Sequence, residues 1–225
     1  ETLEFEGFSI NAHTNAKTNE FAMYHNTLKP GAFAKAGMVA DPVSLFDSAP
    51  DADGAAAVIL AASDYASDMV PHPVRIAGSA VSTDTLALQD RNDPLYLQGV
   101  YHSAYKAYRQ AGINPNDVNL VELHDAFTIL STLSLEAAGF AARGEGWKLA
   151  QSGALGLKGT LPVSTFGGLK ARGNPAGAAG IYQAVEATFQ LRGQAGANQV
   201  ADARVAVIQS LAGLASTAIT HVLTV

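Results

Sequence analysis

Hydrophobic and polar positions follow two different periods along this chain, and the changes of period mark its elements. Short apolar runs bounded by glycine, proline or asparagine predict strands. Five are expected, at residues 55–62, 74–78, 118–123, 205–209 and 216–222. The first is uninterrupted and follows an Asp-Gly pair, which is the pattern of a strand covered on both faces.

Helical periodicity fills the spaces between these runs. Residues 96–111 are rich in aromatic side chains and end at Gly112, a residue typical of a helix C-cap. Another helix is expected from about residue 176 to residue 191. A third would follow Asp125, because aspartate often caps a helix N-terminus.

Strands that alternate with helices predict an α/β fold with a mixed five-stranded sheet covered by helices. Ligands of such sheets bind beyond the C-terminal ends of the strands. His124 directly follows the run at 118–123, so we expect it at this edge of the sheet.

Composition narrows the class of protein. Of the 225 residues 48% are hydrophobic and 15% charged, as in folded globular domains. The formal net charge is −6 and no run of lysine or arginine occurs, which argues against nucleic acid or an anionic membrane as the main partner. With no long apolar run that predicts a membrane span, we expect a cytoplasmic protein.

The residue types also limit the chemistry. The chain has no cysteine, so it supplies no disulfide, no thiolate metal site and no cysteine nucleophile. Asp51 and Asp53 are interpreted as turn caps rather than as a carboxylate pair. The histidines other than His124 lack metal-ligand spacing and no metal site is predicted; they are His13, His25, His72, His102 and His221.

The glycine-rich segment 167–180 is the most informative stretch of the sequence. Glycine allows close backbone approach to a ligand and positive φ angles. The helix that follows would direct free N–H groups and its positive dipole end at the loop. The loop carries the carboxamide of Asn174, which could hold a polarised oxygen. A purely structural turn before a buried helix is the alternative.

His124, Asn174 and the small residues at 209–213 form the candidate site. A neutral imidazole donates a hydrogen bond or accepts a proton near neutral pH, and an amide donates without changing charge. Together they could stabilise an enolate or a thioester oxyanion. A structural histidine at the strand end is the competing interpretation.

Several motifs resemble those of the sterol-carrier-type and archaeal thiolases, the branch that includes acetyl-CoA acetyltransferases and lipid-transfer proteins. They occur in the family's order and span nearly the whole chain, at residues 53–57, 114–118, 122–127, 167–180 and 190–193. The chain is therefore identified as a thiolase-superfamily member, C-terminal portion only.

This resemblance implies a thiolase-like layered fold, in which two similar halves build an α-β-α-β-α architecture. Residues 74–225 would be the C-terminal domain. Residues 1–73 would be the end of the loop region and the last strand of the N-terminal half. The family's nucleophilic cysteine has no counterpart here, so the implied partners are a complementary N-terminal half, a second copy of the chain or a small zinc-ribbon/OB-fold subunit.

The resemblance also assigns roles to residues. Three would be catalytic, namely His124, Asn174 and the backbone N–H of Ala212. Five would contact the substrate, namely Ala126, Phe127, Gly173, Ser210 and Gly213. Asn174 stands where thiolases carry a histidine, whereas the related ketoacyl synthase III enzymes pair histidine with asparagine. Ser210 is not expected to be a nucleophile, because nothing beside it in sequence identifies an activating base.

Three functions remain open at this stage. The first is an acyl-CoA C-acyltransferase that performs Claisen condensation or thiolytic cleavage. It would use a coenzyme A thioester as substrate and no metal or redox cofactor. The second is a non-catalytic thiolase-like subunit that binds acyl-CoA or lipid. The third is a component of an acyl-CoA retro-aldolase.

Overall fold

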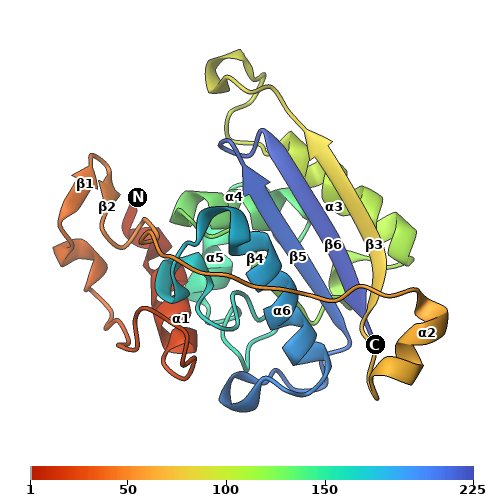
Figure 1. The fold of residues 1–225 in the computed structure, drawn as a ribbon. Helices are drawn as coiled ribbons and strands as arrows, with labels where there is room; N and C mark the ends of the chain where they lie inside the picture. Colours follow the sequence, from red (N-terminus) through yellow and green to blue (C-terminus); the bar gives the residue numbers. More distant parts are fainter. Residues whose placement is uncertain (1) are drawn as a thin grey trace.

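A mixed four-stranded sheet lies at the centre of the computed structural model, which describes residues 2–225 (Figure 1). Its strands, in spatial order, are β3 (Arg75–Thr83), β6 (Thr217–Thr224), β5 (Val205–Ala212) and β4 (Leu120–Leu123). β4 and β5 are parallel, and β6 is antiparallel to both of its neighbours. The C-terminal ends of β3, β4 and β5 therefore share one edge of the sheet.

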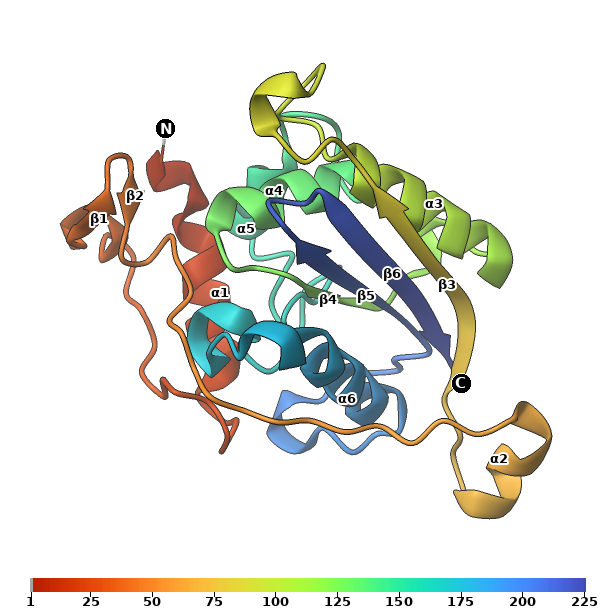
Figure 2. The same cartoon turned by 45° about the horizontal axis from the view of Figure 1, so that its top comes forward.

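Helices cover both faces of this sheet (Figure 2). α3 (Gln98–Ala111) packs on β3 and β6, with α4 (Thr128–Ala137) on the same side, and α6 (Ala179–Leu191) covers the opposite face. The alternation of side chains along β4 explains this arrangement. Val121 and Leu123 join the core under α3 and α4, whereas Leu120 packs with the residues of α6.

The other elements are shorter and lie around this centre. They are α1 (Glu6–Ala16), α2 (Ser63–Met69), α5 (Gly146–Gln151), β1 (Met38–Ala40), β2 (Val43–Ser44), the 3-10 turns η1 (Thr2–Phe5), η2 (Phe33–Lys35), η3 (Leu88–Asp90), η4 (Pro115–Asp117), η6 (Ala176–Ala178) and η7 (Gly196–Asn198), and the π-helical turn η5 (Gly168–Arg172). None of the helices in the described part of the chain has the length and hydropathy that crossing a membrane requires.

The predicted α/β class with a mixed, helix-covered sheet is confirmed. Four predicted strands are present, and Gly112 ends α3 with a left-handed φ of +69°, as its position predicts.

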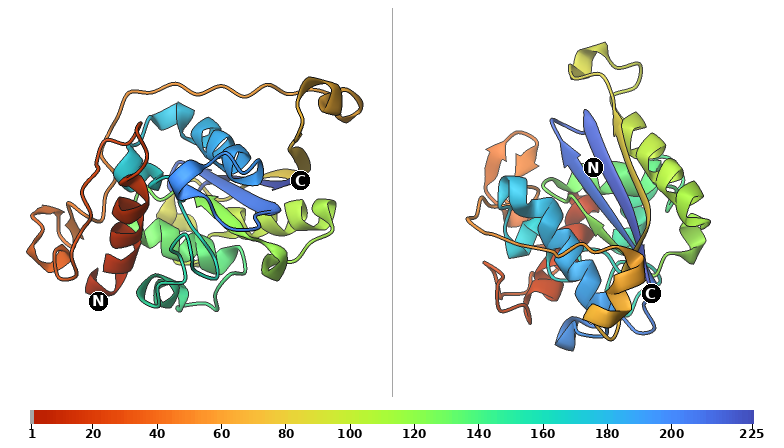
Figure 3. Two further views of the ribbon diagram at one scale, coloured as in Figure 1. Left: turned by 90° about the horizontal axis from the view of Figure 1, so that it is seen from below. Right: turned by 45° about the vertical axis from the view of Figure 1, so that its right-hand side comes forward.

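The prediction that residues 55–62 form a buried fifth strand of this sheet is wrong. This segment is extended but exposed, and Ile59 at its centre is 94% exposed. It crosses the outside of α6 on its way to α2 (Figure 3, left). The apolar pattern predicts a strand that is buried by other elements, but within residues 2–225 the segment pairs with no sheet. The predicted five-stranded sheet is therefore a four-stranded one, and Val163 extends it beyond β4 only by an isolated parallel bridge to Val121.

Candidate active site

His124 is the first residue after β4 and lies at the shared edge of the sheet, as predicted. Leu123 pairs with Gln209 of β5, so the next position on that strand is Ser210. The half-buried ring of His124 has no hydrogen-bond partner within residues 2–225. Burial lowers its pKa, and the charge of Asp125 opposes this shift. The imidazole is therefore neutral near pH 7 and available to a ligand.

Asp125 does not cap α4, contrary to the prediction. The helix starts after Phe127, with no side-chain cap. The buried carboxylate of Asp125 instead accepts hydrogen bonds from the N–H of Leu169 at 2.7 Å and from Ser164 Oγ at 3.3 Å. Partners some forty positions away are invisible to a local pattern. These bonds tie the loop that carries His124 to the glycine-rich loop.

The glycine-rich loop requires glycine for two reasons. Gly168 has a φ of +54°, and a Cβ there would lie 2.2 Å from Asp125 Oδ2. Gly173 has a φ of +112°, and a Cβ there would lie 2.8 Å from the side chain of Ala52. Both the backbone angles and the lack of space thus exclude larger residues. The close approach seen here is between protein segments, so glycine has a structural use at these two positions.

An extended segment at residues 49–52 contacts both predicted site loops. The N–H of Ala49 donates to the carbonyl of Ala126 at 2.8 Å, and the carbonyl of Pro50 accepts from the N–H of Asn174 at 2.9 Å. Successive residues of an extended chain are only about 3.3 Å apart. The two loops are therefore side by side, although they are some fifty positions apart in sequence.

Asn174 presents one free end of its carboxamide. Its Oδ1 accepts the N–H of Ala176 at 3.2 Å, at the start of the turn that leads into α6. Its Nδ2 has no hydrogen-bond partner in the described part of the chain. The amide is therefore oriented so that its N–H groups can donate to a ligand oxygen.

Ser210 is engaged in packing rather than beside a base. Its hydroxyl donates to Gln183 Oε1 at 2.5 Å, and a Cβ on Gly180 would lie 2.9 Å from its Oγ. These contacts seat the first turn of α6 on β5.

Ala212 ends β5 opposite Thr217, in strand conformation. The turn that follows is unusual, since Gly213, Leu214 and Ala215 have φ angles of +55°, +51° and +62°. Left-handed conformations cost non-glycine residues roughly 1–2 kcal/mol each. This strained turn thus lies at the edge of the sheet that also carries His124.

Sequence reasoning missed four buried charged side chains near these loops. Each is under 5% exposed, and they are Glu122, Lys170, Arg172 and Glu186. Burial, followed by the nearby charge of Glu186, raises the pKa of Glu122 to about 8. Burial raises the pKa of Glu186 to about 7 and lowers that of Lys170 to about 8. One of them could have been found from the sequence, because Glu122 interrupts an otherwise apolar strand.

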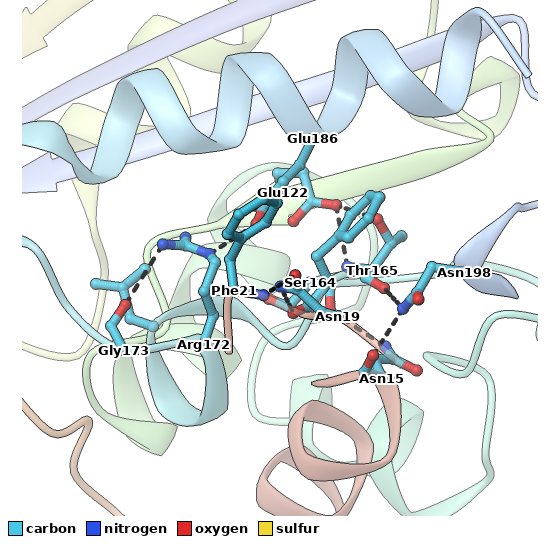
Figure 4. A network of polar contacts seen from close by, with 12 residues as sticks. Asn15, Asn19, Phe21, Glu122, Ser164, Thr165, Arg172, Gly173, Glu186 and Asn198 are labelled. Carbon is cyan, nitrogen blue, oxygen red and sulfur yellow. Dashed lines mark hydrogen bonds and ion pairs between the residues drawn. The ribbon is translucent and has the colours of Figure 1, made fainter. Parts of the chain in front are cut away.

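Glu122 links β4 to the segment before the glycine-rich loop (Figure 4). Its Oε1 accepts the N–H of Thr165 at 3.0 Å and the Thr165 hydroxyl at 2.5 Å. His124 thus stands between two acidic residues that both bond to residues 164–169. Within residues 2–225 no three His, Cys, Asp or Glu side chains gather where a metal ion could be held.

A profile of the family described as "Thiolase C-terminal domain-like" matches residues 80–225. The chain belongs to this family. The resemblance seen in its motifs is thereby confirmed. The boundary predicted between residues 73 and 74 stays a prediction.

The curated relatives are longer than this thiolase C-terminal domain chain. It is 40% identical over 214 residues to an acetyl-CoA acetyltransferase of Methanothermobacter thermautotrophicus, covering 95% of this chain and 56% of that protein. It is 30% identical over 212 residues to sterol carrier protein 2 of Rattus norvegicus, and this match covers 92% of this chain and 39% of that protein. The chain thus spans about half the length of the relatives it matches, or less.

A solved structure confirms the fold. The Ltp2-ChsH2(DUF35) aldolase superposes with a TM-score of 0.88, covering 99% of this chain and 58% of that one. The sequence identity is 24%, so this likeness concerns the thiolase fold alone.

Proposed function

We propose that this thiolase C-terminal domain is part of an acyl-CoA C-acyltransferase, which forms or cleaves a carbon–carbon bond between acyl thioesters. The contact of both predicted site loops with residues 49–52 carries the proposal. It brings the loops of His124 and Asn174 together, and neither side-chain donor has a partner among residues 2–225. Coenzyme A thioesters would be the substrates, and no metal or redox cofactor is needed.

In this proposal His124 and Asn174 donate hydrogen bonds to the thioester oxygen of the acyl acceptor. Negative charge grows on that oxygen as the α-carbon gives its proton to a base, so these donors stabilise the enolate. This base, like the cysteine, would come from outside this chain, because His124 and Asn174 act as donors. The α-carbon then attacks an acyl group held as a thioester on a cysteine, and the cysteine thiolate leaves. Thiolysis is the reverse. The cysteine would come from outside this chain, because the chain has none.

The remaining predicted residues would surround the thioester. The backbone N–H of Ala212 would donate to the oxygen of the cysteine-bound acyl group. The pantetheine arm would pass along residues near the two loops and the end of β5, namely Ala126, Phe127, Gly173, Ser210 and Gly213. Phe127 is 39% exposed and so is accessible to a ligand.

The exposed apolar segment 55–62 supports a complementary thiolase half as partner. Val58, Ile59 and Leu60 are 39%, 94% and 73% exposed. An extended apolar segment gains most from burial as a strand of another sheet. Residues 1–73 would then be the end of the loop region and the last strand of that half. A second copy of the chain is the alternative source of such a surface.

A small zinc-ribbon/OB-fold subunit is a further partner in this proposal. The solved aldolase described above carries the names of two components, Ltp2 and ChsH2(DUF35). That name also supports the retro-aldolase as a second candidate function. The third candidate is a non-catalytic subunit that binds acyl-CoA or lipid. It is supported by the absence of cysteine and by Asn174, which stands where thiolases carry a histidine.

Mass spectrometry and kinetics together test the proposal. The protein, purified with whatever chain completes it, is incubated with acetyl-CoA, and an acyl-enzyme adduct is expected. His124→Ala should lower the rate of condensation by roughly 10²–10³-fold, as loss of one oxyanion donor does. His102→Ala is the matched control, because His102 is exposed on α3.

The outcomes separate the candidates. An adduct with an unchanged rate in His124→Ala removes His124 from the mechanism. No adduct, together with retained binding of acetyl-CoA, supports the non-catalytic subunit instead. Release of a ketone from a β-hydroxyacyl-CoA, without an adduct, supports the retro-aldolase.

A further inference from the structure

Arg172 is the last residue of η5, two positions before Asn174, and it is buried with only 4% exposure. Its Nε lies 2.6 Å from Glu186 Oε1, and its Nη1 donates to the carbonyl of Gly173 at 3.4 Å. Its guanidinium carbon lies 4.5 Å from the ring centroid of Tyr182. Figure 4 shows the side chain extending from the loop toward Glu186 on the helix above it.

These contacts join the glycine-rich loop to one face of α6. Tyr182 and Glu186 are four positions apart and so lie one above the other on that helix. The first turn of α6 is itself seated on β5 through Gly180 and Ser210. Arg172 therefore connects the backbone beside Asn174, through α6, to β5, the strand that ends at the candidate site.

The opposite side of the loop is held by backbone bonds that need no particular side chain. The N–H of Met23 donates to the carbonyl of Arg172 at 3.1 Å, and the N–H of Asn174 donates to Pro50. The link toward α6 depends instead on the guanidinium, which forms an ion pair with Glu186 and lies over the ring of Tyr182. Within residues 2–225 its Nε and Nη2 have no hydrogen-bond partner, so charge and stacking carry this link. Lysine carries the same charge but lacks the flat face that stacks on Tyr182.

We propose that Arg172 is a positioning residue for acyl transfer, which fixes the carboxamide of Asn174 relative to α6 and β5 without touching substrate. This inference rests on the proposed function. Burying an arginine and a glutamate together is rarely a net gain in stability, since desolvation opposes their attraction. A role in placing the neighbouring amide explains why the pair stands beside this loop.

The consequence is kinetic. An amide displaced by about 1 Å from its productive position can lower a rate by about 10²-fold. Arg172→Lys should therefore lower kcat by about 10–10²-fold and change KM by less than about threefold. The effect should be transmitted through Asn174 alone.

A double-mutant comparison tests this transmission in the complete, assembled enzyme. Arg172→Lys and Asn174→Ala are measured singly and together. Arg192→Lys, at the C-cap of α6 and away from the glycine-rich loop, is the control. We expect Arg172→Lys to lower kcat in the parent and to change it less than about twofold in Asn174→Ala. A full additional loss in the double variant would mean a general structural role, and would overturn the inference. So would an unchanged kcat in Arg172→Lys alone.

Failure of the proposed function gives a different pattern. If Asn174→Ala keeps full activity, both the role of Asn174 and its positioning by Arg172 are refuted. Should Arg172→Lys not fold, as judged by the fluorescence of Trp147, Tyr182→Leu replaces it. That variant keeps both charges and removes only the stacking ring. We expect it to lower kcat about threefold to tenfold in the parent and to have no such effect in the Asn174→Ala background. Equal losses in both backgrounds would overturn the inference.

Discussion

Replacing Asp125 by alanine removes the buried carboxylate that ties the end of β4 to the glycine-rich loop. The N–H of Leu169 and the hydroxyl of Ser164 lose their acceptor, and both residues are at most 2% exposed. Lys170 also loses one of the two negative charges that favour its protonated form. The substitution therefore leaves unsatisfied polar groups inside the protein.

The size of the effect follows from these groups. An unsatisfied buried donor costs about 1–3 kcal/mol, and more where a charge is involved. The Leu169 N–H alone gives a value in this range, and the lost compensation of Lys170 adds to it. We expect Asp125→Ala to lower the free energy of unfolding by about 3 kcal/mol. For a chain of this length, that is a fall in Tm of roughly 6–12 °C.

Urea unfolding followed by Trp147 fluorescence measures this change. Asp125→Asn is the matched control, because its Oδ1 still accepts from Leu169, and it should cost about half as much. A loss below about 0.5 kcal/mol in Asp125→Ala would refute the reasoning, since surface substitutions typically have effects of that size.

Three further predictions concern other positions. Gly168→Ala should destabilise by at least about 2 kcal/mol in urea unfolding, because it adds a 2.2 Å contact with Asp125 at a positive φ; a smaller loss would show that the loop relaxes. Glu122 has a pKa raised from 4.5 to about 8, so the folded state keeps a proton that the unfolded chain has released. Its contribution to stability is thus full below about pH 4.5 and is lost as the pH rises to about 8. Glu122→Gln resembles the protonated side chain, so it should reduce the pH dependence of the free energy of unfolding by roughly 1 kcal/mol per pH unit. An unchanged slope between pH 5 and 9 would contradict this role of Glu122. Ile59→Lys should change the stability of the chain by less than about 0.5 kcal/mol but weaken its association with a complementary half, measured by co-purification; intact association would reject residues 55–62 as the contact.

Local pattern predicted those elements whose partners lie in the described chain. The apolar runs at 118–123 and 205–209 became neighbouring strands, and Gly112 ended its helix as expected. The run at 55–62 has the same pattern but is exposed. An apolar pattern indicates that a segment favours burial, but it does not identify the element that buries it.

The positions of the two candidate loops were predictable in part, and their roles stay predictions. The predicted position of His124 at a strand end is confirmed. The structure also brings its loop beside that of Asn174 through residues 49–52, a segment that the sequence did not single out for this. The bonds that hold these loops were not predictable. Asp125 bonds to Leu169, and Arg172 pairs with Glu186, through contacts that only the folded chain creates. Such long-range partners leave no periodic trace in the sequence.

The most direct test of the account is a structure of the assembled protein with a non-cleavable acetyl-CoA analogue bound. We expect one thioester oxygen within about 2.7–3.2 Å of both a ring nitrogen of His124 and Nδ2 of Asn174. An analogue bound elsewhere, or an oxygen that only one of these two groups can reach, would contradict the shared hydrogen-bond site.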